Sequence, residues 1–373
     1  LDEIDTAARD LHSVNTVAFR DGRAIGYNTD ILGFAESLTR DGVTLRGKKV
    51  LLLGYGGAAS VMAYHCVTQG AYVTITGRNL EKAAALQKQL CAAVPGAHVA
   101  VFSRRHIPRD IQIVLNSTPV GMFPKENASP LHYLPHKTEY VFDAIYNPPV
   151  TATMKLANHK KTKTRDGLYM LVMQAAHAQT IWSGVQFEPQ ACETILRRTY
   201  GKMAVKRLHE KHGKRNIVLC GFMGSGKTTI GRKLARLTGL DFIDADQYLE
   251  AQEGQKISDI FAEKGEAYFR DRETAYIREL SQRSGIVLSL GGGAVLRPEN
   301  VSAVRETGLL IHLDTPFYRI LKNLSYSNTR PLLDKPDKQA ETRRLYNARK
   351  AIYHRVSDVS VRSPKISEVL EKV

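Results

Sequence analysis

The sequence predicts an α/β protein of two domains, each a three-layer α/β/α arrangement around a mainly parallel sheet. Two observations predict this class. At two places, residues 48–69 and 217–237, an apolar strand runs into a glycine-rich turn and then into a helix. The chain has 373 residues, which is enough for two separate hydrophobic cores. We therefore expect two ligand-binding α/β domains in series.

The chain opens with Leu1-Asp-Glu-Ile rather than Met, in what we expect to be the middle of a helix, so we interpret it as a piece of a longer polypeptide. A strand, a turn at Asp21-Gly22 and a second strand follow. Asp30 then stands directly before a helix expected over residues 31–38. Taken alone, Asp30 is best interpreted as an N-cap of that helix.

The segment GYGGAA at 54–59 follows a strand at 48–53 and precedes a helix at 60–69 and a second strand at 71–76. This βαβ unit carries a GxGxxA variant of the dinucleotide-binding fingerprint, in which small residues allow a pyrophosphate to approach closely. We expect cofactor contacts at Gly54, Gly56, Gly57 and Ala58.

The residues after that second strand favour NADP over NAD. An NAD site would place an acidic residue there, whereas this chain has Arg78-Asn79-Leu-Glu-Lys82. A guanidinium can bind the 2′-phosphate bidentately, so we expect Arg78 as the main clamp, with Asn79 and Lys82 beside it. The alternative, in which these residues only begin an exposed helix, stays open.

Residues 1 to about 190 resemble shikimate dehydrogenase. Polar loops follow strands expected at 110–115 and 140–142, and a Met- and Trp-bearing helix is expected at 167–184, with these side chains in the core. The likeness is carried by VNT at 14–16, NTD at 28–30, GYGGAA at 54–59, GR at 77–78, NSTPVGM at 116–122, DAIYNP at 143–148 and GLYMLVMQAAHAQTIW at 167–182.

This resemblance implies NADP-linked reduction of 3-dehydroshikimate to shikimate, with Asp30 as a catalytic residue. It implies substrate contacts at Asn15, Asp30, Tyr146 and Gln174, and cofactor contacts at Asn116, Thr118, Met122 and Gly167. In that family a lysine works beside the aspartate and a Ser-x-Ser pair holds the substrate carboxylate. Both would precede Leu1. A positioned acid–base group contributes about 10²–10⁴-fold in rate, so we expect this chain alone to be a very poor dehydrogenase. The alternative is a regulatory NADP-binding module without turnover.

The joint between the domains is expected in the charged run at 206–215, with Gly213 as the break. We accordingly assign residues 1–208 to the first domain, 209–215 to a linker and 216–373 to the second domain.

The second domain begins with a strand at 217–220 followed by GFMGSGKT at 221–228 and a helix, which is the P-loop pattern in its usual setting. Backbone N–H groups of such a turn bind phosphate oxygens, Lys227 reaches the β- and γ-phosphates, and the Thr228 hydroxyl can ligate Mg²⁺. The alternative, a glycine-rich turn that binds nothing, is disfavoured by the flanking strand and helix. Nucleotide contacts are expected at Gly221, Gly224, Ser225, Gly226, Lys227, Thr228 and Thr229.

Further along, Asp244 and Asp246 follow a short strand at i and i+2, a spacing that in an extended segment directs both carboxylates toward the phosphate site. Helix capping by Asp246 is the plain alternative. Three glycines at 291–293 follow a strand at 286–290 and expose N–H groups to a ligand. A polar loop at 323–339 is predicted to be a lid. A helix then carries Arg349 and Tyr353.

Residues 216–373 are similar to shikimate kinase. The likeness is carried by GFMGSGKTTIGRKLA at 221–235, FIDAD at 242–246, IFAEKGEAYFR at 260–270, LSLGGGAV at 288–295 and RPLL at 330–333. It implies a nucleoside-monophosphate-kinase fold and ATP-dependent phosphorylation of the shikimate 3-hydroxyl. The implied roles are hydroxyl activation by Asp246, carboxylate binding by Arg270 and Arg349, ring contacts at Gly292 and Gly293, Mg²⁺ binding by Thr228 and Asp244, and charge compensation by Lys227 and Arg330.

The composition agrees with small anionic substrates. A formal net charge of +16 suits nucleic acid, acidic membranes or phosphorylated and carboxylated metabolites. No RNA-binding signature, zinc spacing or membrane-spanning run is present, so we expect neither nucleic acid nor membrane as a partner. Four scattered cysteines predict reduced thiols and a cytoplasmic location. Because one predicted activity forms the substrate of the other, the pattern predicts a multifunctional shikimate-pathway enzyme.

Overall fold

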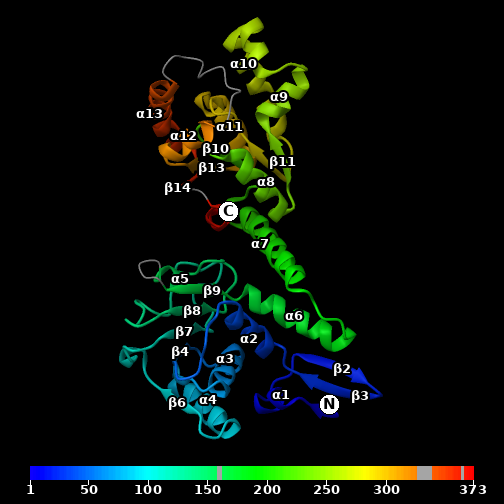
Figure 1. The fold of residues 1–373 in the computed structure, drawn as a ribbon, viewed down its shortest axis with the longest axis vertical. Helices are drawn as coiled ribbons and strands as arrows, with labels where there is room; N and C mark the ends of the chain where they lie inside the picture. Colours follow the sequence, from blue (N-terminus) through cyan, green and yellow to red (C-terminus); the bar gives the residue numbers. More distant parts are fainter. Residues whose placement is uncertain (158–161, 326–337, 363–364) are drawn as a thin grey trace. The chain divides into compact units, whose positions relative to one another are not determined.

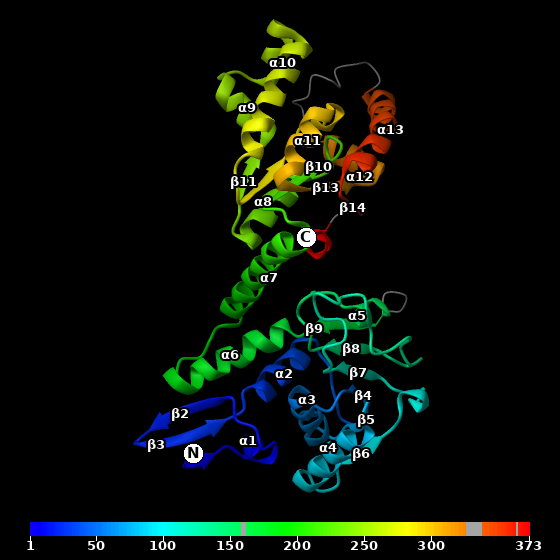
Figure 2. The same ribbon diagram turned by 180° about the vertical axis from the view of Figure 1, so that it is seen from behind.

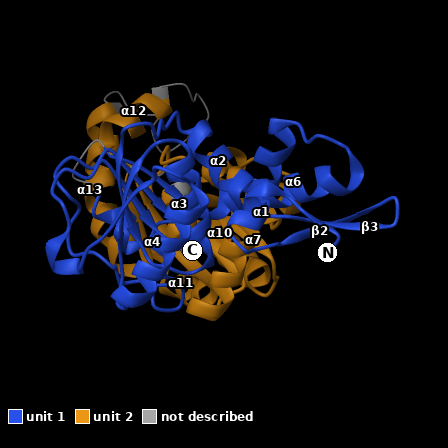
Figure 3. Cartoon of the chain, turned by 90° about the horizontal axis from the view of Figure 1, so that it is seen from below, with its two compact units in different colours: residues 1–196 blue, residues 197–373 orange. Residues whose placement is uncertain are grey.

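The computed structural model describes residues 1–157, 162–325, 338–362 and 365–373. It divides the chain into two compact units, residues 1–196 and 197–373, which Figure 3 shows in separate colours. Each unit is built on a parallel sheet with helices on both faces (Figures 1 and 2). The predicted α/β class is therefore confirmed for both units.

Unit 1 contains a six-stranded parallel sheet in the order β6-β5-β4-β7-β8-β9. Strand order reverses between β4 and β7, and this is where doubly wound sheets bind dinucleotides. Its strands are β4 Lys49–Leu53, β5 Tyr72–Thr76, β6 His98–Val101, β7 Ile113–Asn116, β8 Tyr140–Asp143 and β9 Lys163–Asp166. Its helices, in chain order, are α1 Thr6–Asp10, α2 Asp30–Arg40, α3 Gly57–Thr68, α4 Leu80–Ala93, α5 Ala152–Lys155 and α6 Leu168–Ser183, with a short 3-10 turn at Arg104–His106.

The apolar runs of the central strands are explained by burial on both faces. Along β4, Val50 and Leu52 pack into one core with Phe34, whereas Leu51 and Leu53 pack into a second core on the opposite face. Alternate side chains of a strand point to opposite faces, so only a strand covered on both sides can be apolar throughout.

A second, three-stranded sheet of unit 1 is formed by β1 Glu3–Ile4, β2 Thr16–Arg20 and β3 Arg23–Tyr27. The predicted strand–turn–strand at Asp21-Gly22 is confirmed, with Asp21 at a φ of 51°. The helical state expected for residues 1–4 is wrong, because Glu3–Ile4 pairs with β3 as a parallel strand, and the helix begins only at Thr6.

The core position predicted for Trp182 on α6 is also wrong. Its side chain is 55% exposed, and its indole Nε1 donates to the carbonyl of Val17 on β2 at 2.8 Å. Helical periodicity identifies a face of α6, but it does not reveal how far the neighbouring elements extend over that face.

The division between the units lies within helix α7, Pro189–His212, rather than in a linker at 209–215. Residues of α7 after the division belong to unit 2, since Leu208 is buried with Ile217 and Arg207 donates to the carbonyl of Glu371 at 2.7 Å. The predicted linker is corrected accordingly: residues 209–212 are helical, and the helix ends before Gly213.

Unit 2 contains a five-stranded parallel sheet in the order β11-β12-β10-β13-β14. Ile217 and Leu219 of β10 face one core, and Val218 and Cys220 face the other. Its strands are β10 Asn216–Cys220, β11 Asp241–Asp244, β12 Ile286–Ser289, β13 Gly308–Asp314 and β14 Val359–Arg362. Its helices after α7 are α8 Lys227–Thr238, α9 Ala245–Glu253, α10 Ile257–Ser281, α11 Pro298–Thr307, α12 Phe317–Ser325, α13 Lys338–Val356 and α14 Ile366–Lys372, with a 3-10 turn at Ala294–Leu296. Among the described residues, no helix is both long and apolar enough to cross a bilayer.

Candidate functional site

The glycine-rich turn of unit 2 leads from the central strand β10 directly into α8. Gly226 is the N-cap of α8 and has a φ of +92°, a conformation that L side chains rarely adopt. No side chain caps this end of the helix, so the first N–H groups of α8 are open to a ligand. Free N–H groups and the partial positive charge of the helix end form an anion site.

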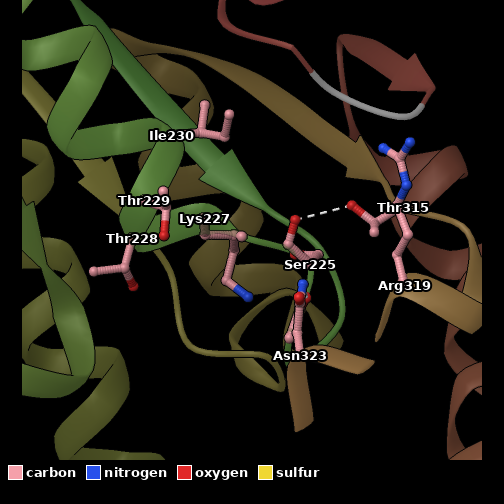
Figure 4. A pocket seen from close by; sticks show the side chains of 10 residues that line it. Ser225, Lys227, Thr228, Thr229, Ile230, Thr315, Arg319 and Asn323 are labelled. Atoms are coloured by element: carbon pink, nitrogen blue, oxygen red, sulfur yellow. Dashed lines mark hydrogen bonds between the residues drawn. The ribbon is translucent and has the colours of Figure 1, made fainter. Parts of the chain in front are cut away.

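A cavity of about 440 Å³ opens beside this turn (Figure 4). In the figure, Thr228 and Thr229 lie on one side of Lys227 and Ser225, and Thr315 and Arg319 on the other. The cavity is lined by Gly224, Ser225, Gly226, Lys227, Thr228, Thr229, Ile230, Thr315, Arg319 and Asn323.

Sequence reasoning missed four of these lining residues, namely Ile230 of α8 and three residues from elsewhere in the chain. Thr315 donates to the carbonyl of Ser225 at 2.9 Å, and Asn323 donates to the carbonyl of Gly224 at 2.8 Å. Both side chains, together with Arg319, come from the segment that follows β13. The rule that ligands bind beyond the carboxyl ends of parallel strands was the only signal that could have pointed to them.

The polar groups at the turn fit a bound phosphate chain. The Ser225 hydroxyl is buried and has no hydrogen-bond partner among the described residues. The Lys227 ammonium donates to the carbonyls of Gly221 and Phe222 at 2.9 and 3.1 Å, so it lies folded over the turn. A buried hydroxyl without a partner is costly, and a phosphate oxygen would satisfy it.

Thr228 and Asp244, the two predicted Mg²⁺ ligands, are in direct contact. The Thr228 hydroxyl donates to the Asp244 carboxylate at 2.8 Å. The described residues contain no cluster of three or more metal-ligating side chains. This fits Mg²⁺, which is usually held by one or two protein oxygens together with phosphate oxygens and water.

Asp246 does not occupy the extended position predicted for it. Strand β11 ends at Asp244, and Asp246 lies in the first turn of α9. The capping alternative is also wrong, because the Asp244 carboxylate is the N-cap and accepts the Asp246 N–H at 3.2 Å. The Asp246 carboxylate instead approaches the triple-glycine loop, where a Cβ on Gly291 would lie 2.5 Å from its oxygen.

Arg270 on α10 is brought to the same loop. A Cβ on Gly293 would lie 2.6 Å from the Arg270 guanidinium, so only glycine permits this approach. The guanidinium donates to Glu273 at 2.7 Å and to Glu266 at 3.2 Å. Burial lowers the pKa of Arg270, but its pairing with these carboxylates outweighs burial and raises the pKa overall.

Glu273 was not predicted from the sequence and lies at the centre of this cluster. Its side chain is 4% exposed, and one carboxylate oxygen has no hydrogen-bond partner among the described residues. Burial raises the pKa of Glu273 against the opposing effect of Arg270, and the nearby Asp246 raises it further. The cluster therefore contains two carboxylates and a guanidinium beside the predicted ring site.

The helix α13 brings Arg349 to the same region. Tyr353, one turn further along α13, donates its hydroxyl to the carbonyl of Gly292. Burial raises the pKa of Tyr353, and the charge of Arg349 opposes that rise. Arg330 and residues 326–337 of the predicted lid at 323–339 lie outside the described residues, whereas residues 323–325 and 338–339 are helical rather than loop. The structure thus brings together five predicted kinase-site residues, namely Asp246, Arg270, Gly292, Gly293 and Arg349.

In unit 1, the turn at 54–59 fits a pyrophosphate. Gly56 is the N-cap of α3 without a side-chain cap, and a Cβ on Gly56 or Gly57 would meet only open space. Gly54 follows the last residue of β4, and Ala58 lies in the first turn of α3. The N-terminus of α3 therefore presents a second set of backbone N–H groups that a ligand can bind.

The predicted 2′-phosphate clamp follows β5, the neighbour of β4. Arg78 and Lys82 are exposed, and neither forms an ion pair with another described residue. The Asn79 side chain is the N-cap of α4 and accepts the Lys82 N–H at 2.9 Å. The segment begins an exposed helix, as the alternative interpretation expected, and it also presents two cations without ion pairs among the described residues, so the phosphate clamp stays a prediction.

The polar loops after β7 and β8 are held by a buried network. Asn116 donates to Asp143 at 2.9 Å and accepts from the Thr118 hydroxyl at 2.7 Å. Met122 and Tyr146 are 48% and 41% exposed. Gly167 has a packing reason of its own, because a Cβ there would lie 2.1 Å from the carbonyl oxygen of Ala144.

Three of the predicted substrate residues of unit 1, namely Asn15, Asp30 and Gln174, lie close together around Thr29. The carboxamide of Asn15 accepts the Thr29 N–H at 2.9 Å, and the Thr29 hydroxyl donates to Gln174 at 3.3 Å. Burial raises the pKa of Asp30, against an opposing hydrogen bond from Asn15. The N-cap of α2 is Thr29, so the capping role considered for Asp30 is wrong.

Comparison with known proteins assigns both units. Residues 223–373 match the family model for shikimate kinase, and residues 35–168 match the model for shikimate / quinate 5-dehydrogenase. The chain is 43% identical over 155 residues to the shikimate kinase of Cupriavidus pinatubonensis, covering 42% of this chain and 81% of that protein. It is 46% identical over 139 residues to the shikimate kinase of Persephonella marina, covering 37% and 84%.

One similar solved structure is shikimate kinase from Acinetobacter baumannii in complex with shikimate. It is 34% identical, the match covers 44% of this chain and 92% of that chain, and the TM-score is 0.41. Another is the shikimate 5-dehydrogenase of Thermus thermophilus in complex with NADP(H) and shikimate. It is 32% identical, the match covers 53% of this chain and 72% of that chain, and the TM-score is 0.46. The chain therefore belongs to the shikimate kinase family through its C-terminal unit, and it carries a shikimate dehydrogenase domain ahead of that unit in the same polypeptide.

Proposed function

We propose that unit 2 transfers the γ-phosphoryl group of ATP to the 3-hydroxyl of shikimate. ATP would supply the phosphoryl group, and Mg²⁺ would offset negative charge on its phosphates. The open N–H groups of α8 and the Lys227 ammonium bind the phosphates, while Thr228 and Asp244 hold the metal. Asp246 orients the attacking hydroxyl and accepts its proton. The observation that carries this proposal is the convergence of Asp246 and Arg270 on the triple-glycine loop.

The acidic substrate requires cations at the opposite end of the ring. We assign its carboxylate to Arg270 and Arg349, because a guanidinium binds a carboxylate bidentately. Ring contacts are assigned to Gly292 and Gly293, and Arg330 is assigned to charge compensation during transfer. In an assay of ADP release, the chain should consume ATP only when both shikimate and Mg²⁺ are present. ADP release that does not depend on shikimate would refute the assignment.

For unit 1 we propose NADP-dependent reduction of 3-dehydroshikimate, at a rate limited by its acid–base chemistry. NADP supplies the hydride when it is bound at the turn 54–59. Asp30, Asn15 and Gln174 hold the substrate. Asp30 forms no ion pair with another described residue. A complete acid–base arrangement raises the rate by about 10²–10⁴-fold, and a single group supplies less than this. We therefore expect slow turnover by this chain.

The same observation supports a second candidate, an NADP-binding regulatory module without turnover. Two measurements on the purified chain separate the candidates, namely NADPH oxidation with 3-dehydroshikimate and NADPH binding by fluorescence titration. Oxidation that Asp30→Asn abolishes supports the slow enzyme. Binding without any oxidation supports the module, and absence of binding contradicts both.

A further inference from the structure

Tyr353 on α13 lies between two groups that the proposed kinase function assigns to the substrate. Its side chain is 1% exposed and comes one helical turn after Arg349. The phenol hydroxyl donates to the carbonyl of Gly292. This hydrogen bond joins α13, the helix that carries Arg349, to the triple-glycine loop.

The bond to Gly292 sets the direction of one peptide plane. In a trans peptide, the C=O of Gly292 and the N–H of Gly293 point in opposite directions. Because the carbonyl is turned toward Tyr353, the Gly293 N–H is turned away from it. Neither Gly292 nor Gly293 donates its N–H to another described residue, so these donors are available to a ligand oxygen.

The ring of Tyr353 is held independently of its hydroxyl. It stacks on the His312 imidazole, with ring centroids 5.3 Å apart and planes inclined by 19°. It also belongs to the core that contains Cys220 and Val295. A phenylalanine would retain these contacts and lose one oxygen atom, so the hydroxyl can be tested separately from the packing.

We propose that Tyr353 is a positioning residue for the acidic substrate of the kinase unit, and this proposal rests on the proposed kinase function. Its hydroxyl orients the Gly292–Gly293 peptide for that small molecule. Neither Arg349 nor Gly292 lines the cavity beside the P-loop. Loss of the hydroxyl therefore weakens binding of the acid and leaves binding of the nucleotide unchanged.

The test is Tyr353→Phe in the full chain, measured as KM for shikimate, KM for ATP, kcat and thermal midpoint. We expect KM for shikimate to rise about five- to tenfold, which corresponds to one lost hydrogen bond. KM for ATP should stay at the wild-type value. Tyr276→Phe is the matched control, because the Tyr276 hydroxyl donates to Glu253 at 2.7 Å, away from the triple-glycine loop.

Three outcomes would overturn the proposal. The first is an unchanged KM for shikimate in Tyr353→Phe, and the second is an equal rise in Tyr276→Phe, which would indicate general loosening. The third is an equal rise in KM for ATP in Tyr353→Phe, which would show that the effect is not confined to the acidic substrate. The wild-type chain tests the proposed function itself. If it does not phosphorylate shikimate, the function fails; if it does and only the KM prediction fails, the function stands.

Discussion

The two glycine-rich turns of this chain occupy the same place in their folds but differ in side-chain chemistry. Each connects a central strand to a helix whose N-cap is a glycine without a side-chain cap. In unit 2 the turn carries Lys227 and Thr228, and Thr228 contacts Asp244. In unit 1 the segment GYGGAA has no charged residue, and the nearest predicted cations, Arg78 and Lys82, follow the neighbouring strand.

We interpret this difference as one between a turn that only binds a phosphate, in unit 1, and a turn that also supports phosphoryl transfer, in unit 2. Backbone N–H groups at a helix end are sufficient to bind a phosphate that does not react. Transfer also requires charge placed at the phosphoryl group as it moves, which a lysine and a metal supply. For the cations of unit 1, which follow β5, we instead propose that they bind a static 2′-phosphate and so distinguish two dinucleotides. The predictions below test this contrast.

The largest effect is expected for Asp246→Asn. An amide cannot accept the proton of the substrate hydroxyl, so kcat for shikimate phosphorylation should fall about 10²–10⁴-fold. Nucleotide binding, measured by titration with an ATP analogue, should be unchanged. Asp241→Asn is a suitable control, because Asp241 is exposed at the start of β11, the strand that precedes α9. Wild-type turnover by Asp246→Asn would contradict the role of Asp246 in phosphoryl transfer by unit 2.

The next largest effect is expected for Lys227→Met. Loss of the ammonium removes a donor aimed at the transferring group, and removal of one such donor costs about 10²–10³-fold in kcat. Steady-state ADP release measures this, with Lys233→Met, an exposed lysine of α8, as the control. Equal losses in both variants would show that general surface charge, rather than Lys227, is responsible.

A smaller effect is expected for Arg78→Gln in unit 1. A charge-assisted hydrogen bond contributes about 1.5–3 kcal/mol, so the affinity for NADPH should fall about 10- to 100-fold. The affinity for NADH should not change, because NADH lacks the 2′-phosphate. Fluorescence titration of both cofactors measures the ratio, and Lys88→Gln, on the same helix as Lys82, serves as control. A parallel loss for both cofactors would argue against the clamp.

The smallest effect concerns acid stability in unit 2. His312 lies at the end of β13, and burial lowers its pKa to about 4, with the charges of His354 and Lys227 adding to the effect and Asp314 opposing it. The folded pKa of His312 lies below the ordinary value of 6.5. Between these two pKa values, the unfolded chain therefore binds a proton that the folded unit does not bind. The stability contribution is therefore complete above pH 6.5 and is lost as pH falls toward 4.

Between pH 7 and pH 5 this loss is about 2 kcal/mol, from 1.36 kcal/mol per pKa unit. His312→Gln should remove that part of the pH dependence, and His209→Gln, an exposed histidine of the same unit, should retain it. Hydrogen exchange of peptides from β13 during urea unfolding at the two pH values reports on unit 2 alone. The same slope in His312→Gln as in the wild type would contradict the pKa assignment.

The features predicted well from the sequence are those determined locally. The strands before both glycine-rich turns, and the helices after them, follow from apolar runs and from the positions of Gly56 and Gly226. The contact between Thr228 and Asp244 was also expected, because both follow the carboxyl ends of parallel strands in one sheet.

The features predicted poorly depend on where an element ends or on what covers it. The i, i+2 rule failed for Asp246 because β11 stops two residues earlier, where Asp244 caps the next helix. Trp182 has the spacing of a core residue, yet it is exposed because its surroundings are set by tertiary structure. Thr315 and Asn323 belong to no motif and reach the turn from about 90 residues away in sequence, as their hydrogen bonds show.

The most direct test of the contrast between the two turns is phosphorus NMR of the full chain with ATP, Mg²⁺ and shikimate. We predict a new phosphate monoester signal that forms at the same rate in Arg78→Gln as in the wild type and that is absent in Asp246→Asn. A wild-type sample without the ester, or an Asp246→Asn sample that forms it at the wild-type rate, would contradict the account.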